Sequence, residues 1–179
     1  MLAYVETLDL ELLRFFHLGD APSWLVLATV VVTWLGSGWI LFGLLPALAI
    51  RKLRLPTCWL IGTVLGTSLL VWIVKEITGR VRPCHVLTWA SAVYVTPPDG
   101  PSFPSGHSAG SFAFAAFVFM AHRRWGMVAL IIAALVALSR VALGVHYPTD
   151  IVAGSLLGMT LGALAGSRAM RENRQPASS

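Results

Sequence analysis

The sequence predicts an all-α integral membrane protein with about five transmembrane helices and an N-terminal amphipathic helix. Of its 179 residues, 56% are hydrophobic and only 12% are charged, whereas about a quarter of the residues in a soluble protein are charged. The charges also cluster, since none falls between Asp20 and Arg51 or between Arg54 and Lys75. Uncharged apolar stretches of about 20 residues can cross the hydrocarbon core of a bilayer. We therefore expect one membrane domain over residues 1–179.

Residues 1–20 are predicted to form a helix that lies flat in the membrane interface. Acidic residues separate apolar residues that recur near helical spacing, which is typical of an interfacial amphipathic helix. The apolar positions are Leu2, Val5, Leu8, Leu12, Phe15 and Phe16.

Five apolar stretches follow as candidate spans, at 22–50, 55–75, 105–121, 125–143 and 149–167. The first is long enough to tilt, and its glycines and Pro46 favour close packing or a kink. Between the second and third spans lies one long loop, residues 78–104, and a loop of this length is usually functional or mobile. Its aromatic residues Trp89 and Tyr94 are expected to anchor the interface or to form a lid.

Lys and Arg residues in the short connections predict the orientation of the spans. Three basic groups, within residues 51–54, 123–124 and 168–174, follow alternate spans and so fall on one side, which we assign to the cytoplasm together with the tail 168–179. The opposite side receives the N-terminus, the long loop and the connection around His146. It also contains four cations that oppose the rule that Lys and Arg lie on the cytoplasmic side. Cations that break this rule at helix ends near the membrane indicate a functional site. They are Lys75, Arg80, Arg82 and Arg140.

The remaining composition argues against other classes of site. A net charge of +5 would suggest nucleic-acid binding in a soluble protein. In a membrane protein it reflects the loop charges that set topology, so we expect no nucleic-acid partner. The two cysteines, Cys58 and Cys84, have neither disulfide-framework nor zinc-site spacing.

Three separate segments bring polar residues to the outer ends of the spans. Lys75, Arg82 and Arg140 supply fixed positive charges suited to phosphate oxygens. Ser105 stands where a helix N-cap is expected, so that free backbone N–H groups point at an anion. Gly106 lets the backbone approach that anion closely. Together these residues predict a phosphate-binding pocket.

Two histidines and one aspartate complete the chemistry. His146 and Asp150 are four residues apart, which places them on one face of a helix start. The carboxylate can fix the imidazole tautomer and leave the other ring nitrogen as a nucleophile, while His107 can protonate the leaving oxygen. The predicted reaction is phosphoryl transfer through a phosphohistidine, followed by hydrolysis. No carboxylate cluster suited to magnesium accompanies the pocket, so we expect neither a metal nor a cofactor.

Each of these residues alone has an ordinary structural interpretation, since a single Lys or Arg at a helix end usually extends toward the headgroups. Together they resemble the signature of the type 2 phosphatidic acid phosphatase superfamily. The motifs are Lys75-x6-Arg82-Pro83, Pro104-Ser105-Gly106-His107 and Ser139-Arg140-x5-His146-x3-Asp150. The resemblance implies His146 as nucleophile, Asp150 as its partner and His107 as acid. It implies that Lys75, Arg82, Ser105, Gly106 and Arg140 hold the phosphate. Many bacterial lipid phosphatases of this family have six spans, whereas the first is reduced to an interfacial helix here.

The apolar spans exclude the soluble vanadium haloperoxidases of that superfamily. Compact members with an outward-facing site act on undecaprenyl diphosphate, phosphatidylglycerol phosphate, phosphatidate, lipid A phosphate or a polyprenyl sugar phosphate, and we rank undecaprenyl diphosphate first. The expected partners are a membrane lipid phosphate and the bilayer, and the expected location is the inner (cytoplasmic) membrane with an extracytoplasmic site. Two alternatives stay open: a phosphatase of soluble sugar phosphates, and an anion channel or transporter that uses the same basic pocket. The oligomeric state is open.

Overall fold

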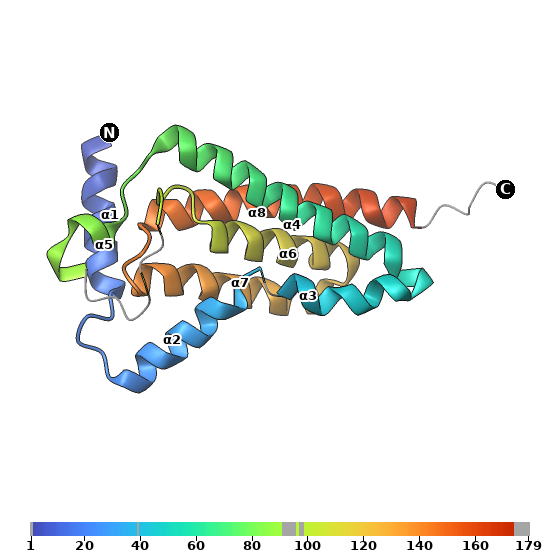
Figure 1. Ribbon diagram of the computed structural model, residues 1–179, viewed down its shortest axis with the longest axis horizontal. Helices are drawn as coiled ribbons and strands as arrows, with labels where there is room; N and C mark the ends of the chain where they lie inside the picture. The colour runs from blue at the N-terminus through green and yellow to red at the C-terminus, as the bar shows by residue number, and fades with distance from the viewer. Residues whose placement is uncertain (1, 39, 91–95, 97–98, 174–179) are drawn as a thin grey trace.

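The computed structural model describes residues 2–38, 40–90, 96 and 99–173, and in these residues the regular structure is entirely helical (Figure 1). Arg174 of the predicted basic groups, residues 174–179 of the predicted tail and Tyr94 of the long loop lie outside the described residues. In chain order the elements are α1 (Leu2–Phe16), α2 (Ser23–Leu35), α3 (Ile40–Leu44), η1 (Leu45–Ala49), α4 (Arg51–Thr78), α5 (Pro83–Val86), η2 (Thr88–Ala90), α6 (Gly106–Ala121), α7 (Arg123–Ala142) and α8 (Pro148–Glu172).

Helix α6 lies at the centre of the bundle and packs against α4, α7 and α8. Small residues make its contact with α8 unusually close. A Cβ atom added at Gly158 of α8 would lie only 2.0 Å from the carbonyl oxygen of Ala109, and one added at Gly162 would lie 2.2 Å from that of Ala113. Glycines at every fourth position of α8 face α6 in this way, a spacing that lets two membrane helices meet backbone to backbone. They are Gly154, Gly158, Gly162 and Gly166.

Large apolar side chains cover the outside of the bundle, as expected for a protein embedded in lipid. Trp72 of α4, Ile131 of α7 and Leu156 of α8 are each more than half exposed. By length and composition, three stretches of the described chain can cross a membrane: Arg51–Val86, Arg123–Ala142 and Pro148–Glu172. The apolar helices Ser23–Leu35 and Gly106–Ala121 are shorter. The region predicted as one span over 22–50 divides into α2, α3 and η1, with the break after Leu35 among the predicted glycines.

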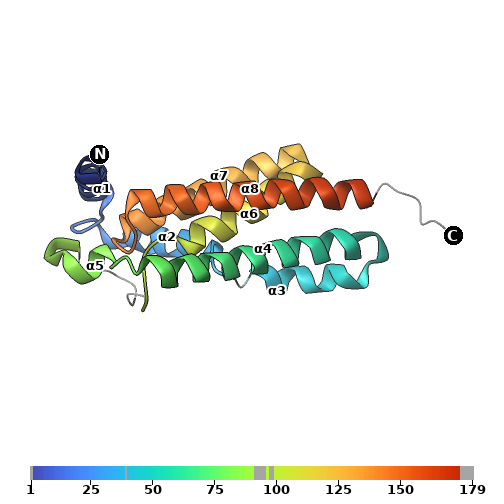
Figure 2. The same cartoon turned by 90° about the horizontal axis from the view of Figure 1, so that it is seen from above.

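Helix α1 crosses one end of the bundle nearly at right angles to the long helices (Figures 1 and 2). Its predicted apolar stripe points outward, since Leu12 is 43% exposed and Phe15 is 80% exposed. Asp9 and Leu13 lie at one edge of this stripe and are buried. Trp89 of the long loop packs edge-on against His17, just after α1. The predicted N-terminal helix is therefore present, and the contact between Trp89 and His17 ties the loop to it. The place of this helix in a membrane interface stays a prediction.

The two ends of the bundle carry different groups. Figures 1 and 2 show the turn before α4, the α6–α7 connection and the end of α8 together at one end. The described residues of the predicted basic groups belong to these segments, at the starts of α4 and α7 and the end of α8. The end of α4, the start of α6 and the α7–α8 connection lie at the other end, beside α1. The three sequence motifs therefore meet at a single end of the bundle.

Candidate active site

The connection between α7 and α8 places a histidine beside an aspartate. His146 is 2% exposed and stands just before Tyr147, the N-cap residue of α8. Pro148 fits the first position of a helix because its missing N–H needs no partner there. Asp150 turns back in this first turn and accepts a hydrogen bond from the Tyr147 N–H at 2.9 Å. The same carboxylate oxygen lies 3.3 Å from Nδ1 of His146.

The other ring nitrogen of His146 faces an arginine. Nη1 of Arg82 lies 3.1 Å from Nε2 of His146 and also donates to the carbonyl oxygen of Val145 at 3.0 Å. Arginine can only donate, so Nε2 accepts and the proton resides on Nδ1, which donates to Asp150. This assignment leaves the Nε2 lone pair directed at a guanidinium group, where a phosphate is expected.

Burial lowers the pKa of His146 to about 4. The positive charges of Arg82 and Arg140 act in the same direction, whereas the bond to Asp150 raises the pKa. A neutral imidazole at pH 7 retains the lone pair that a nucleophile needs.

The start of α6 is fixed against this connection. Ser105 is the N-cap residue, and its Oγ accepts hydrogen bonds from the N–H and the hydroxyl of Ser108. The Ser105 N–H donates to the carbonyl oxygen of Asp150 at 3.0 Å, which joins the second motif to the third. Gly154 of α8 sits directly against the Ser105 carbonyl, where a Cβ would lie at 2.5 Å. The close α6–α8 packing thus sets the distance between the helix start and His146.

Two further cations complete the predicted set. Nζ of Lys75, in the last turn of α4, donates to the carbonyl oxygens of Pro101 and Ser102. Arg140 is 4% exposed and donates from Nη1 to the hydroxyl of Thr33 at 2.8 Å, while its buried Nε has no hydrogen-bond partner. A buried N–H group without a partner is rare and is suited to an oxygen atom of a bound anion.

The structure therefore brings the predicted site residues to one place. His107, in the first turn of α6, is close enough to interact electrostatically with four of them: Lys75, Arg82, Arg140 and His146. Ser105 and Gly106 precede it directly. The roles of these residues remain predictions. Among the described residues, no group of three or more His, Cys, Asp or Glu side chains is placed to hold a metal ion.

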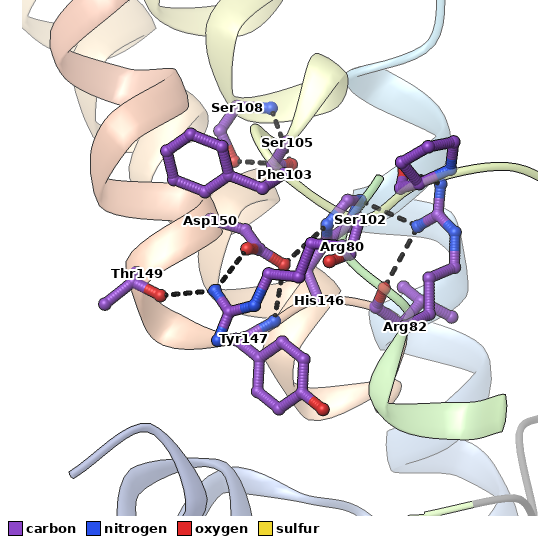
Figure 3. Close-up of polar contacts among 12 residues, drawn as sticks. Arg80, Arg82, Ser102, Phe103, Ser105, Ser108, His146, Tyr147, Thr149 and Asp150 are labelled. Atoms are coloured by element: carbon purple, nitrogen blue, oxygen red, sulfur yellow. Dashed lines mark hydrogen bonds and ion pairs between the residues drawn. The ribbon is translucent and has the colours of Figure 1, made fainter. Parts of the chain in front are cut away.

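Asp9 and Thr149 of this network were not predicted from the sequence, and Arg80 was assigned no role in catalysis or phosphate binding. Figure 3 shows Arg80 reaching toward Asp150 and Thr149, with Nη1 2.8 Å from Oδ1 of Asp150. The second arm of Arg80 binds Asp9 of α1 at 2.7 Å. From the sequence, Arg80 was only one of the four cations that oppose the topology rule, whereas in the structure its guanidinium bridges two carboxylates. The only signal for Asp9 in the sequence is that helical spacing places this acid, with Leu13 four residues on, at the edge of the apolar stripe.

An apolar cavity of about 530 Å³ opens beside the site. Lys75, Gly106 and His107 line its polar part. Its walls come from α2, α4, α6 and α7, with side chains that include Leu35, Val71, Trp72, Phe114 and Ile132. The cavity therefore joins a cationic end to a hydrocarbon-like interior.

Comparison with known proteins places these motifs in a family context. The model of the PAP2 superfamily matches residues 56–174. A decaprenylphosphoryl-5-phosphoribose phosphatase of Mycobacterium tuberculosis is 36% identical over 134 residues, which cover 73% of this chain and 71% of that protein. The crystal structure of a transmembrane PAP2-type phosphatidylglycerolphosphate phosphatase from Bacillus subtilis superimposes with a TM-score of 0.79 at 26% identity, over 97% of this chain and 89% of that one. Aquifex aeolicus LpxE gives a TM-score of 0.76 at 28% identity, over 88% and 94%.

Proposed function

This chain belongs to the PAP2 superfamily, and from that membership we propose that it hydrolyses a phosphate ester of an isoprenoid-linked lipid through a phosphohistidine. Phosphatase activity in a membrane is supported by the family and by the names of its relatives. The observation that carries the mechanism is the position of His146 between Asp150 and Arg82.

In the first step, the lone pair on Nε2 of His146 attacks phosphorus. The N–P bond forms as the bond from phosphorus to the lipid oxygen breaks, and His107 donates a proton to that oxygen. Asp150 accepts from Nδ1 and stabilises the imidazole as it gains positive charge. Arg82 already lies 3.1 Å from Nε2, so its donors reach the equatorial phosphate oxygens without moving far.

In the second step, water attacks the phosphohistidine. His107, now neutral, takes a proton from the water, the N–P bond breaks, and inorganic phosphate leaves with His146 restored. Arg140 serves both steps, because its unpartnered Nε gains an acceptor only when phosphate is bound. The free N–H groups at the start of α6 add partial positive charge on the same side.

We propose that no metal ion takes part. Lys75, Arg82 and Arg140 supply the positive charge that a magnesium ion supplies in other phosphoryl-transfer enzymes. Their N–H groups donate hydrogen bonds to neutral groups, namely main-chain carbonyls, a threonine hydroxyl and the His146 ring. Activity in the presence of EDTA tests this part of the proposal.

The apolar cavity supports a substrate with a hydrocarbon chain, since its walls suit an isoprenoid or acyl tail and its polar end carries Lys75 and His107. The sequence alone ranked undecaprenyl diphosphate first. The similarity to a decaprenylphosphoryl-5-phosphoribose phosphatase over 73% of the chain moves a polyprenyl-linked sugar phosphate ahead of it. By the basic connections, the site faces away from the cytoplasm in the inner membrane.

Phosphate release by the purified protein tests the proposal. The panel holds a polyprenyl sugar phosphate, undecaprenyl diphosphate, phosphatidylglycerol phosphate, phosphatidate and lipid A, with ribose 5-phosphate as the soluble comparator. We expect the polyprenyl sugar phosphate to give the highest kcat/KM and His146→Ala to abolish release. A preference for ribose 5-phosphate would contradict a lipid substrate. Substantial activity in His146→Ala would contradict the phosphohistidine.

A further inference from the structure

Helix α1 places a charged side chain inside the protein. Asp9 is only 2% exposed, although α1 lies on the outside of the bundle and turns its apolar stripe away from it. Leu13, one turn later, is fully buried against Val141 and Tyr147 and fixes this face of the helix against α7 and α8. A carboxylate is buried at such a position only where partners compensate for its lost hydration.

Asp9 binds the first turn of α8. Its Oδ1 accepts from the Thr149 N–H at 2.9 Å, and its Oδ2 accepts from the Thr149 hydroxyl at 2.5 Å. The N–H of a residue in the first helical turn has no partner within its own helix. The Asp9 carboxylate of α1 accepts this hydrogen bond, as an N-cap side chain normally does. The negative charge also lies at the positive end of the α8 dipole.

Arg80 extends this contact to the nucleophile. Its Nη2 donates to Asp9 at 2.7 Å, and its Nη1 donates to Oδ1 of Asp150 at 2.8 Å. The guanidinium carbon lies 4.0 Å from the centre of the Tyr147 ring, which holds its plane. Asp150 is thereby held at both oxygens, by Arg80 at Oδ1 and by His146 and the Tyr147 N–H at Oδ2.

We propose that Asp9 and Arg80 are positioning residues for the phosphoryl-transfer reaction, and that α1 orients the nucleophile through them. Neither residue needs to touch the substrate. Asp9 fixes Arg80 and the start of α8, Arg80 fixes Asp150, and Asp150 fixes the tautomer and the direction of His146. The inference rests on the proposed function, because it assigns the network a role in that reaction.

Kinetics of four variants test the inference in the full-length protein in detergent. Asp9→Asn keeps the size of the side chain but weakens its bonds to Arg80 and Thr149. Glu11→Gln makes the same chemical change at an exposed position of α1 and is the matched control. Arg80→Gln and the double variant Asp9→Asn with Arg80→Gln complete a cycle. Size-exclusion chromatography and thermal unfolding measure the folded fraction of each.

We expect Asp9→Asn to lower kcat about 10- to 100-fold, since displacement of a reacting group by about 1 Å can reduce a rate 100-fold. KM should stay within about twofold, because the network does not bind the phosphate. Residues that act as one unit are not additive, so the double variant should lose little more than Arg80→Gln alone. Glu11→Gln should match the wild type.

Three results overturn the inference while leaving the proposed function intact. They are a kcat per folded molecule for Asp9→Asn equal to that of Glu11→Gln, an effect confined to KM, and a double variant whose fold-loss in kcat is the product of the two single losses. If the wild type releases phosphate from none of the lipids, the proposed function fails and the inference fails with it.

Discussion

Replacement of Gly158 by alanine should separate α6 from α8 and reduce catalysis without touching a site residue. The added Cβ would lie 2.0 Å from the Ala109 carbonyl oxygen and 2.9 Å from the Ala113 N–H nitrogen. Ordinary contact begins at 3.4 Å, so the two backbones must move apart by about 1.4 Å at this point. Both contacts are with backbone atoms, which cannot rotate away as a flexible side chain can.

That displacement reaches the site because α6 and α8 carry its two halves. Ser105 and His107 begin α6, and Asp150 begins α8, with Ser105 bonded to Asp150. We expect Gly158→Ala to lower kcat/KM about 100-fold, the loss typical of a shift of about 1 Å between reacting groups. Overpacking should also destabilise the protein by about 1–3 kcal/mol.

Gly62→Ala on α4 is the matched control, since nothing lies within 4 Å of its added Cβ. It should be as active as the wild type and slightly more stable, because alanine favours a helix over glycine. Phosphate release and thermal unfolding in detergent measure both variants. Equal activity and equal melting temperatures in the two would refute the idea that close α6–α8 packing sets the geometry of the site.

Three further predictions follow from the site and the topology. Burial lowers the pKa of His146 to about 4, so the acid limb of kcat/KM should lie near pH 4–5; a limb near 6.5 would show that the nucleophile is not buried. Because His146 has a pKa near 6.5 in the unfolded chain and about 4 in the folded protein, the unfolded chain binds more protons between these values. The free energy of unfolding should therefore be highest above pH 6.5 and fall as the pH drops toward 4. Orthovanadate should inhibit at low concentration as a mimic of the transferring phosphoryl group, whereas EDTA should not; loss of activity on chelation, restored by magnesium, would contradict a metal-free mechanism. With Cys58 and Cys84 replaced, a cysteine at Asp99 should react in intact cells with an impermeant thiol reagent and one at Arg124 should not; the reverse result would invert the orientation.

The sequence predicted much of this fold because its signals are local. Lipid-facing apolar stretches, an N-cap serine and the spacing of His146 and Asp150 each depend on residues close in the chain. The boundaries of α6, α7 and α8 accordingly lie within a few residues of the predicted spans, apart from a longer end of α8. The break of the first span into α2, α3 and η1 was harder to predict, since glycine in an apolar stretch permits either close packing or a kink.

The contacts of α1 could not be predicted in the same way. Asp9 lies 140 residues from Thr149 in the chain, and no local pattern marks an acid that will cap a distant helix. Arg80 was visible as a cation near the site, but its partners decide its role. Under the proposals above, a guanidinium group paired with two carboxylates positions a neighbouring residue, whereas one that donates only to neutral groups is available to bind an anion.

That distinction divides the cations of the site into two kinds. Arg80 lies between Asp9 and Asp150, so its charge is already balanced by carboxylates of the protein. Lys75, Arg82 and Arg140 donate instead to carbonyls, a hydroxyl and an imidazole. Arg82 and Arg140 are buried, and a buried cation without a charged partner carries a large desolvation penalty. Under the proposed function, a bound phosphate offsets this penalty, so we expect part of the folding free energy lost at these side chains to be recovered on binding.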